Sequence, residues 1–202
     1  MSSVTHVFFD IGGVLGTNGW DREQRVAAKT QFELGDEFES RHGEVVAEWE
    51  IGRLTLDEYL DFAVFYRARS FTKEAFIGAM LAQSKPFDST IGLVAQVLAA
   101  KRVRLFTLNN EPEALNVYRI ERFGLRPLFE AFLSSCWLGI RKPSPLIFER
   151  ALGIAQVRAA DVLFVDDREQ NLVPARKIGM QTHHFDGNAQ SLGAALSGVG
   201  AL

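Results

Sequence analysis

The stretch Val162-Leu163-Phe164-Val165-Asp166-Asp167 is an apolar run that ends in two adjacent carboxylates. Two other runs have the same form: residues 7–9 lead to Asp10, and residues 103–108 lead to a pair of asparagines. All three are short and rich in β-branched or aromatic residues, without the polar alternation of a half-exposed strand. We therefore predict three buried parallel strands that each end in polar residues. Weaker strand candidates lie at 131–134 and 181–185.

Helical patterns separate these runs. Apolar residues recur at helical spacing over residues 91–98, and a further pattern spans residues 172–178 and closes at Gly179. Pro143 is a favourable first-turn residue for another helix, which Gly153 is placed to end. Strands that alternate with helices predict an α/β fold: a three-layer, Rossmann-like parallel sheet with helices on both faces.

The stretch from about residue 21 to residue 85 breaks this alternation and contains no convincing strand. Thr55-Leu56-Asp57-Glu58 has the form of a capping box, and an apolar stripe at helical spacing follows it. Residues 45–49 and 75–80 indicate two more helices. We predict a core domain made of residues 1–15 and 86–202, with a helical cap domain, residues 16–85, inserted between its two parts.

The composition describes a globular chain without features of a nucleic-acid or membrane protein. The 202 residues are 47% apolar and 23% charged, and the net charge of −3 argues against binding to a phosphate backbone. The first ten residues lack the pattern of a signal peptide, and no apolar run approaches the ~20 residues of a membrane helix. Cys136 is the sole cysteine, and its apolar surroundings favour a buried thiol over a nucleophile. We expect a cytoplasmic protein; the sequence carries no signal of its oligomeric state.

The polar residues that end the predicted strands belong together in space. Ligands of parallel α/β sheets bind outside the carboxyl ends of the strands, so Asp10, Asn109 and the pair Asp166-Asp167 should gather at one edge. A single aspartate after a strand is more often a helix cap or turn residue, but several such residues weaken that interpretation. Asp10 and Asp167 could supply the carboxylates that Mg²⁺ prefers, and Lys142 could offset the negative charge. Taken alone, Lys142 would be read as a solvated surface charge.

These motifs resemble the haloacid-dehalogenase superfamily, in the branch with a helical cap between its first and second motifs. Residues 10–15, Asp-Ile-Gly-Gly-Val-Leu, resemble the first motif, which carries the nucleophile. Residues 141–145, Arg-Lys-Pro-Ser-Pro, resemble the third motif with its lysine, and residues 164–172 resemble the acidic fourth motif. The motifs occur in the expected order across nearly the whole chain. Sugar-phosphate phosphatases and the N-terminal phosphatase domain of epoxide hydrolases are similar members.

The resemblance implies a Mg²⁺-dependent phosphatase that acts on a small phosphorylated metabolite through an aspartyl-phosphate on Asp10. It also implies roles for the other motif residues. The expected catalytic residues are Asp10, Lys142 and Asn109; the expected metal ligands are Asp10, the Gly12 carbonyl and Asp167; the expected supporting residues are Asp166, Asn171 and Asn110.

Two positions depart from the family pattern. Most phosphatases of this family carry a second aspartate two residues after the nucleophile, as general acid and base, and Gly12 stands there. Some sugar-phosphate phosphatases of the group also resemble this chain in having glycine. The serine or threonine that contacts the phosphoryl group aligns with Leu108, and strand alternation points the neighbouring Thr107 to the opposite face.

Two alternatives to a phosphatase therefore stay open at this point. The chain could be a binding or regulatory protein that kept the fold and lost turnover, which the residues at 12 and 108 favour. Metal-independent dehalogenases of the superfamily attack carbon with the same aspartate. Their pattern has an aromatic residue where Gly12 stands, so we rank this alternative below the first.

Overall fold

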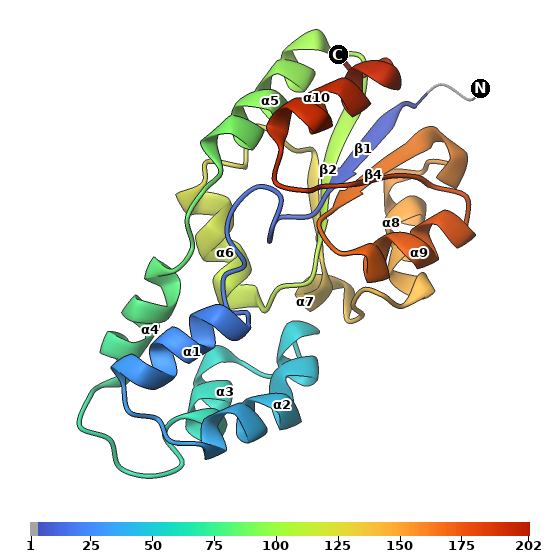
Figure 1. Ribbon diagram of the computed structural model, residues 1–202. Coiled ribbons are helices and arrows are strands. Elements are labelled where there is room, and N and C mark those ends of the chain that lie inside the picture. The colour runs from blue at the N-terminus through green and yellow to red at the C-terminus, as the bar shows by residue number, and fades with distance from the viewer. Residues whose placement is uncertain (1–3) are drawn as a thin grey trace.

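The computed structural model describes residues 4–202; residues 1–3, which begin the predicted core segment 1–15, lie outside the described residues. Five parallel strands form one sheet in the order β3-β2-β1-β4-β5 (Figure 1). The predicted doubly covered parallel sheet is thus confirmed, including its two weaker strands. The strands are β1 (His6–Phe9), β2 (Arg104–Asn109), β3 (Ala131–Ser134), β4 (Val162–Asp166) and β5 (Gln181–His184).

Alternate residues of the strands supply two separate apolar layers. Val7 and Phe9 pack on one face of the sheet with α5 (Asp88–Ala100) and α10 (Ala189–Gly198). Phe8 packs on the other face with α8 (Pro145–Ala155) and α9 (Glu169–Lys177). Because successive side chains of a strand point to opposite faces, one continuous apolar run can fill both layers. The remaining elements of this part are α6 (Glu113–Arg122), α7 (Ser135–Leu138) and a short 3₁₀ helix, η1 (Ala159–Asp161).

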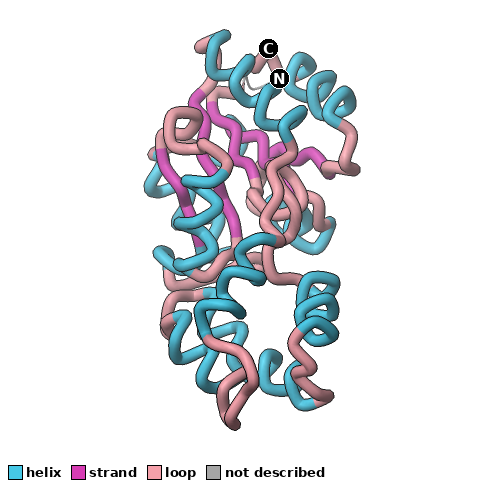
Figure 2. The backbone as a smooth tube through the Cα atoms, turned by 90° about the vertical axis from the view of Figure 1, so that its left-hand side faces the viewer, coloured by secondary structure: helices cyan, strands magenta, loops and turns pink. Residues whose placement is uncertain are grey.

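Residues between β1 and α5 form a group of four helices at one end of the molecule (Figures 1 and 2). These are α1 (Arg22–Gln31), α2 (Glu37–Glu50), α3 (Leu56–Ala63) and α4 (Lys73–Ala82). Their core is aromatic, and the Trp49 and Tyr59 rings stack with centroids 3.8 Å apart. Leu115 of α6 joins this apolar cluster, so the four helices also rest on the sheet-bearing part.

The chain enters and leaves the four-helix group through two adjacent segments. The Thr17 amide donates to the Lys85 carbonyl at 2.9 Å, and the Lys85 amide donates to the Thr17 hydroxyl at 3.1 Å. The predicted capping box at the start of α3 is present, with Thr55 and Glu58 bonded reciprocally. Among the described residues, no helix combines the length and apolar character needed to cross a membrane.

The expected helix between Pro143 and Gly153 is wrong at both ends. The helix α8 starts at Pro145, which occupies its first turn, and continues to Ala155, where Gln156 caps it in the left-handed conformation. Gly153 has no positive φ and continues the helix, and residues 142–143 form a turn that precedes the helix. Helix α1 was not predicted, since its residues are mostly polar and only Ala28 is buried.

Candidate active site

The nucleophile candidate, Asp10, lies directly after β1, at the carboxyl edge of the sheet. Its backbone amide donates to the Val165 carbonyl at 2.9 Å, so the residue continues the strand pairing with β4. The side chain is only 7% exposed, and its Oδ1 accepts the Ile11 amide at 2.8 Å. The backbone holds one oxygen of this carboxylate, and the other is left for the groups around it.

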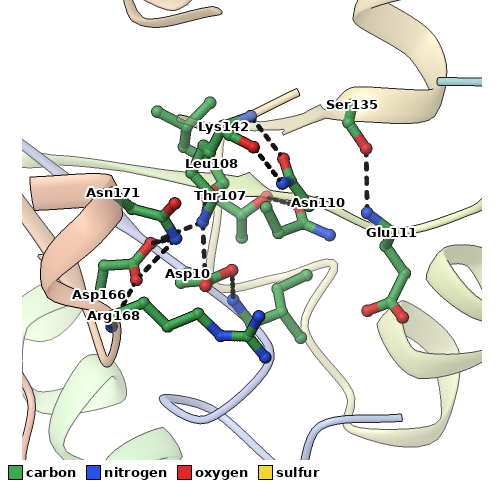
Figure 3. A network of polar contacts seen from close by, with 12 residues as sticks. Asp10, Thr107, Leu108, Asn110, Glu111, Ser135, Lys142, Asp166, Arg168 and Asn171 are labelled. Atoms are coloured by element: carbon green, nitrogen blue, oxygen red, sulfur yellow. Dashed lines mark hydrogen bonds and ion pairs between the residues drawn. The ribbon is translucent and has the colours of Figure 1, made fainter. Parts of the chain in front are cut away.

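Lys142 joins the carboxylates at the ends of two neighbouring strands (Figure 3). Its Nζ lies 2.9 Å from Oδ2 of Asp10 and 2.7 Å from Oδ2 of Asp166, and it donates to the Leu108 carbonyl at 2.9 Å. The lysine is 2% exposed, so this ammonium is fully committed to three oxygen partners. Three segments far apart in the sequence therefore meet at one charged group.

The two adjacent carboxylates have different surroundings. Asp166 is completely buried, and it accepts hydrogen bonds from Lys142, from the Asn171 amide at 3.0 Å and from the Arg168 backbone at 2.8 Å. Asp167 contrasts with it, because its Oδ1 is buried and has no hydrogen-bond partner among the described residues. A buried carboxylate oxygen without a partner is costly unless another group compensates it.

The carboxylates of Asp10, Asp166 and Asp167 have the spacing of a cation site. One ligand oxygen each of Asp10, Asp166 and Asp167 lies within 4.8 Å of the others. Three carboxylates offer only hard oxygen donors, which suit Mg²⁺ better than Zn²⁺. The unpartnered oxygen of Asp167 and this purely oxygen donor set both fit a hard divalent cation.

Burial dominates the electrostatics of the site. Burial is the main reason that the pKa of Asp10 is raised to about 8. Lys142 lowers this pKa, but the negative charges of Asp166 and Asp167 oppose that effect. The pKa of Asp167 is also raised, first by burial and then by Asp166. Both carboxyl groups thus resist ionisation in a protein without a bound cation, and a cation between them would remove that resistance.

The two asparagines at the end of β2 lie in different environments. Asn109 is completely buried, donates to Asn116 Oδ1 at 3.0 Å and accepts from the Ser134 hydroxyl at 2.9 Å, so it does not line the cavity. The geometry does not favour the role expected for it, contact with a phosphoryl group, because strand alternation turns its side chain inward. Asn110 does line the cavity and exchanges two 2.8 Å hydrogen bonds with the Lys142 backbone.

The positions that depart from the family pattern have clear surroundings. Leu108 is completely buried in the apolar layer that contains α8, and only its carbonyl reaches the site. Thr107 is buried as well, and its hydroxyl lies 3.5 Å from Asn109 Oδ1. Leu108 has no hydroxyl, and the Thr107 hydroxyl does not reach the cavity.

A cavity of about 370 Å³ opens over Asp10 and Lys142 and continues to the four-helix group. Trp20, Trp49 and His42 of that group line the cavity. The Nδ1 atom of His42 lies 2.9 Å from the Tyr59 hydroxyl. Burial lowers the pKa of His42 to about 4, so this ring is neutral near pH 7. The thiol of Cys136 does not line the cavity, and burial raises its pKa to about 12.

Sequence reasoning missed a buried ion pair at the cavity wall. Arg119 of α6 is paired with Glu111, which follows the end of β2, and both line the cavity. A signal was available: Arg119 interrupts the buried face of α6, between Leu115 and Ile120. A charged residue on an apolar helical stripe indicates a buried partner, since an unpaired buried charge is strongly unfavourable.

A family model described as haloacid dehalogenase-like hydrolase matches residues 4–179. The chain belongs to this hydrolase family. The residues that suggested the family from the sequence are the same ones that meet around Lys142. Of these, the carboxylates of Asp10 and Asp166 contact the lysine directly.

Curated relatives include hydrolases of phosphate esters. Flavin mononucleotide hydrolase 1 of Arabidopsis thaliana is 31% identical over 163 residues, which are 81% of this chain and 65% of that protein. Phosphoglycolate phosphatase of Thiobacillus denitrificans is 29% identical over 125 residues, which are 61% of this chain and 54% of that protein. This chain thus spans less than two thirds of the length of both relatives.

Solved structures of the same family share the fold. A magnesium complex of a family enzyme from Bacteroides thetaiotaomicron superposes with a TM-score of 0.78 at 20% identity, covering 90% of this chain and 93% of that one. At this level of identity the likeness concerns the arrangement of helices and strands.

Proposed function

We propose that this hydrolase cleaves small phosphate esters with the help of Mg²⁺, through a phosphoryl intermediate on Asp10. The observation that carries the proposal is the contact of Lys142 with Asp10, beside a second carboxylate, Asp167, that has an unpartnered oxygen. A nucleophile and a fixed ammonium group in one cavity, with a second carboxylate within 4.8 Å of the nucleophile, are parts that phosphoryl transfer requires. The phosphatase activities named for the relatives agree with this reaction class.

The residues of the site divide the work. An Asp10 oxygen forms a bond to phosphorus while the ester bond breaks, and its electron pair stays on the leaving oxygen. Water then hydrolyses the acyl phosphate, which frees Asp10 and inorganic phosphate. Lys142 keeps Asp10 in place and compensates charge, while Asp166 holds Lys142 and Asn171 in turn donates to Asp166. Asn110 clamps the Lys142 backbone.

A bound Mg²⁺ would supply charge neutralisation at the transferring phosphoryl group. Asp10, the Gly12 carbonyl and Asp167 would hold it, and Asp166 would support it from its buried position. The donor set fits because it contains only oxygen and includes one unsatisfied carboxylate oxygen.

We further propose that residues 16–85 act as a cap that selects the substrate. The cavity, about 370 Å³, is near the lower end of the ~300–1,000 Å³ typical of ligand sites. Trp20, Trp49 and the neutral His42 line it on the cap side, together with the charged Asp21, Arg25 and Glu50 of the same segment. This lining suits a small metabolite with a phosphate at the Lys142 end and a ring or polar groups at the cap end.

The test is a screen of phosphorylated metabolites for phosphate release, with and without Mg²⁺. Asp10→Asn serves as the blank, because it removes the nucleophile and keeps the shape of the side chain. We expect Mg²⁺-dependent release from small monoesters, absent in the blank. Equal release by Asp10→Asn, or release that chelation leaves unchanged, would contradict the proposal.

A binding protein without turnover is the second candidate, and two observations favour it. Gly12 provides no proton donor, and Leu108 is buried in the core, so neither supplies its usual catalytic group. Such a protein would bind Mg²⁺ and a phosphorylated metabolite in calorimetry and release no phosphate from any ester. The screen above separates the two candidates.

A further inference from the structure

The space beside Gly12 is already occupied. A Cβ atom added to Gly12 would lie 2.7 Å from Oδ1 of Asn18 and 3.8 Å from Cγ of the same side chain. Real Cβ atoms essentially never approach that closely, so a side chain at residue 12 and the Asn18 amide compete for one position. The carbonyl oxygen of Asn18 therefore lies beside the point where a side chain at residue 12 would begin.

Asn18 differs from Asn110 and Asn171, two other asparagines that line the cavity. Asn110 is bonded to Lys142, and Asn171 is bonded to Asp166. The Asn18 side chain, by contrast, forms no hydrogen bond within residues 4–202, although it lines the same cavity as Asp10 and Lys142. Its two N–H donors and its carbonyl are free to meet a ligand.

The backbone around Asn18 is held firmly. Arg119 donates from Nη2 to the Thr17 carbonyl, just before Asn18, and its other terminal nitrogen is paired with Glu111. The same Nη1 lies 3.8 Å from the Cβ position of Gly12 and 3.4 Å from that of Gly19. Arg119 is thus a positioning residue: it holds the backbone at residue 17 and packs against the backbone of residues 12 and 19.

We propose that the amide of Asn18 replaces the carboxyl group missing at residue 12: a half-turn of this unbonded amide brings Nδ2 to the place of Oδ1, and its N–H then donates a hydrogen bond to the leaving-group oxygen of the substrate. The inference rests on the proposed phosphatase function and adds a further catalytic residue to it. When the ester bond breaks, its electron pair passes to that oxygen, and an N–H donor stabilises the growing charge. The amide keeps its proton, so the departing alkoxide takes a proton from water.

This arrangement has a measurable consequence. A donor that stabilises charge without giving up a proton helps most when the leaving group is a poor one. Esters of alcohols should therefore depend on Asn18 more than esters of acidic phenols. In other enzymes, the loss of one such donor slows turnover by roughly 10²–10³-fold.

The test compares kcat/KM for Asn18→Ala and the unaltered protein across phosphate esters of graded leaving-group pKa. We expect a fall of roughly 10²-fold for alkyl phosphates and a much smaller fall for aryl phosphates, with Mg²⁺ affinity and Tm unchanged. Gln190→Ala is the matched control, since it removes an exposed amide on α10, which contributes no residue to the cavity. Asn18→Asp should reduce the dependence on leaving-group pKa, because a carboxylic acid can give up its proton.

Four results would overturn the inference. Equal losses on aryl and alkyl esters in Asn18→Ala would mean a general structural role, and no loss on either would mean no role. A steeper dependence in Asn18→Asp would contradict the proposed contact with the leaving oxygen. If the unaltered protein turns over no ester at all, the phosphatase proposal fails together with this one. If turnover depends on Asp10 but is unchanged in Asn18→Ala, this inference fails and the phosphatase proposal stands.

Discussion

The backbone of Gly13 passes so close to the Asp167 side chain that a Cβ atom there would lie 2.2 Å from Oδ2 and 2.3 Å from Cγ. Gly13 also has a φ of +73°, a conformation that residues with a Cβ rarely adopt. Two features therefore require glycine at residue 13: the positive φ of its backbone and the Asp167 carboxylate packed against it. This contact fixes where the turn after β1 lies relative to the end of β4.

Gly13→Ala should displace Asp167 and weaken the proposed cation site. We expect at least a 10-fold loss of Mg²⁺ affinity in calorimetric titration, plus a loss of stability above ~1 kcal/mol from the strained φ. Gly124→Ala is the control, because Gly124 has a φ of +64° and a Cβ there would meet no atom within 4 Å. The control should lose stability only. Unchanged Mg²⁺ affinity in Gly13→Ala would show that Asp167 is not a ligand.

Lys142→Met should leave two buried carboxylates without their shared cation. Breaking a buried ion pair by removing one partner typically costs about 3–5 kcal/mol, and Lys142 has contacts with both Asp10 and Asp166. The free energy of unfolding, measured with urea, should fall by that amount. Adding Asp166→Asn should restore part of the loss, since one unpaired charge is removed with it. A loss below ~1 kcal/mol would mean that the ammonium is not in the place described.

The pH dependence of stability should reveal the raised pKa of Asp10. Its pKa is about 8 in the folded protein and 3.8 for an aspartate outside such surroundings. Between these two pH values the folded state therefore binds more protons than the unfolded state. Metal-free protein should therefore lose stability as pH rises from about 4 to 8, by up to ~1.4 kcal/mol per pH unit for each such proton. Asp167, whose pKa is also raised, adds to the same trend. Asp10→Asn should make the dependence of stability on pH weaker. An equally steep dependence in that variant would mean that another group causes it.

Much of the fold was predictable from local pattern. The runs at 7–9, 103–108 and 162–165 lie on two apolar layers at once, so burial of both faces left a clear signature. Helix α1 left almost none, because it packs through Ala28 and its other side chains are polar or only partly buried. The start of α8 depends on which of two nearby prolines opens the helix, and the pattern of apolar residues does not distinguish them.

The candidate site was predictable only as far as the strands determine it. The carboxyl ends of parallel strands place Asp10, Asp166 and Asp167 together, and the spacing of 4.8 Å or less follows from that topology. Asn109 lies at the same edge with its side chain turned inward, which a shift of one residue in the register decides. Asn18 and Arg119 reach the cavity through tertiary contacts between distant segments, which the sequence pattern does not encode.

Gly12→Asp should restore a proton donor only when space is made for it. The new Cβ would lie 2.7 Å from Asn18 Oδ1, which must rotate away. We expect the change alone to raise kcat/KM on alkyl phosphates by less than ~10-fold, and the pair Gly12→Asp with Asn18→Gly to raise it by roughly 10- to 100-fold. Steady-state kinetics of both variants and of Asn18→Gly alone measure this coupling. Independent, additive effects would mean that the two residues do not share one position.

In the proposed reaction, Asp10 becomes phosphorylated during each turnover. Rapid-quench mass spectrometry of the peptide that contains Asp10, taken within a single turnover of an aryl phosphate, measures this directly. We predict a phosphoryl group on Asp10 that forms only with Mg²⁺ and disappears as inorganic phosphate is released, with none in Asp10→Asn. Steady release of phosphate without any phosphoryl group on that peptide, or undiminished release by Asp10→Asn, would contradict the account.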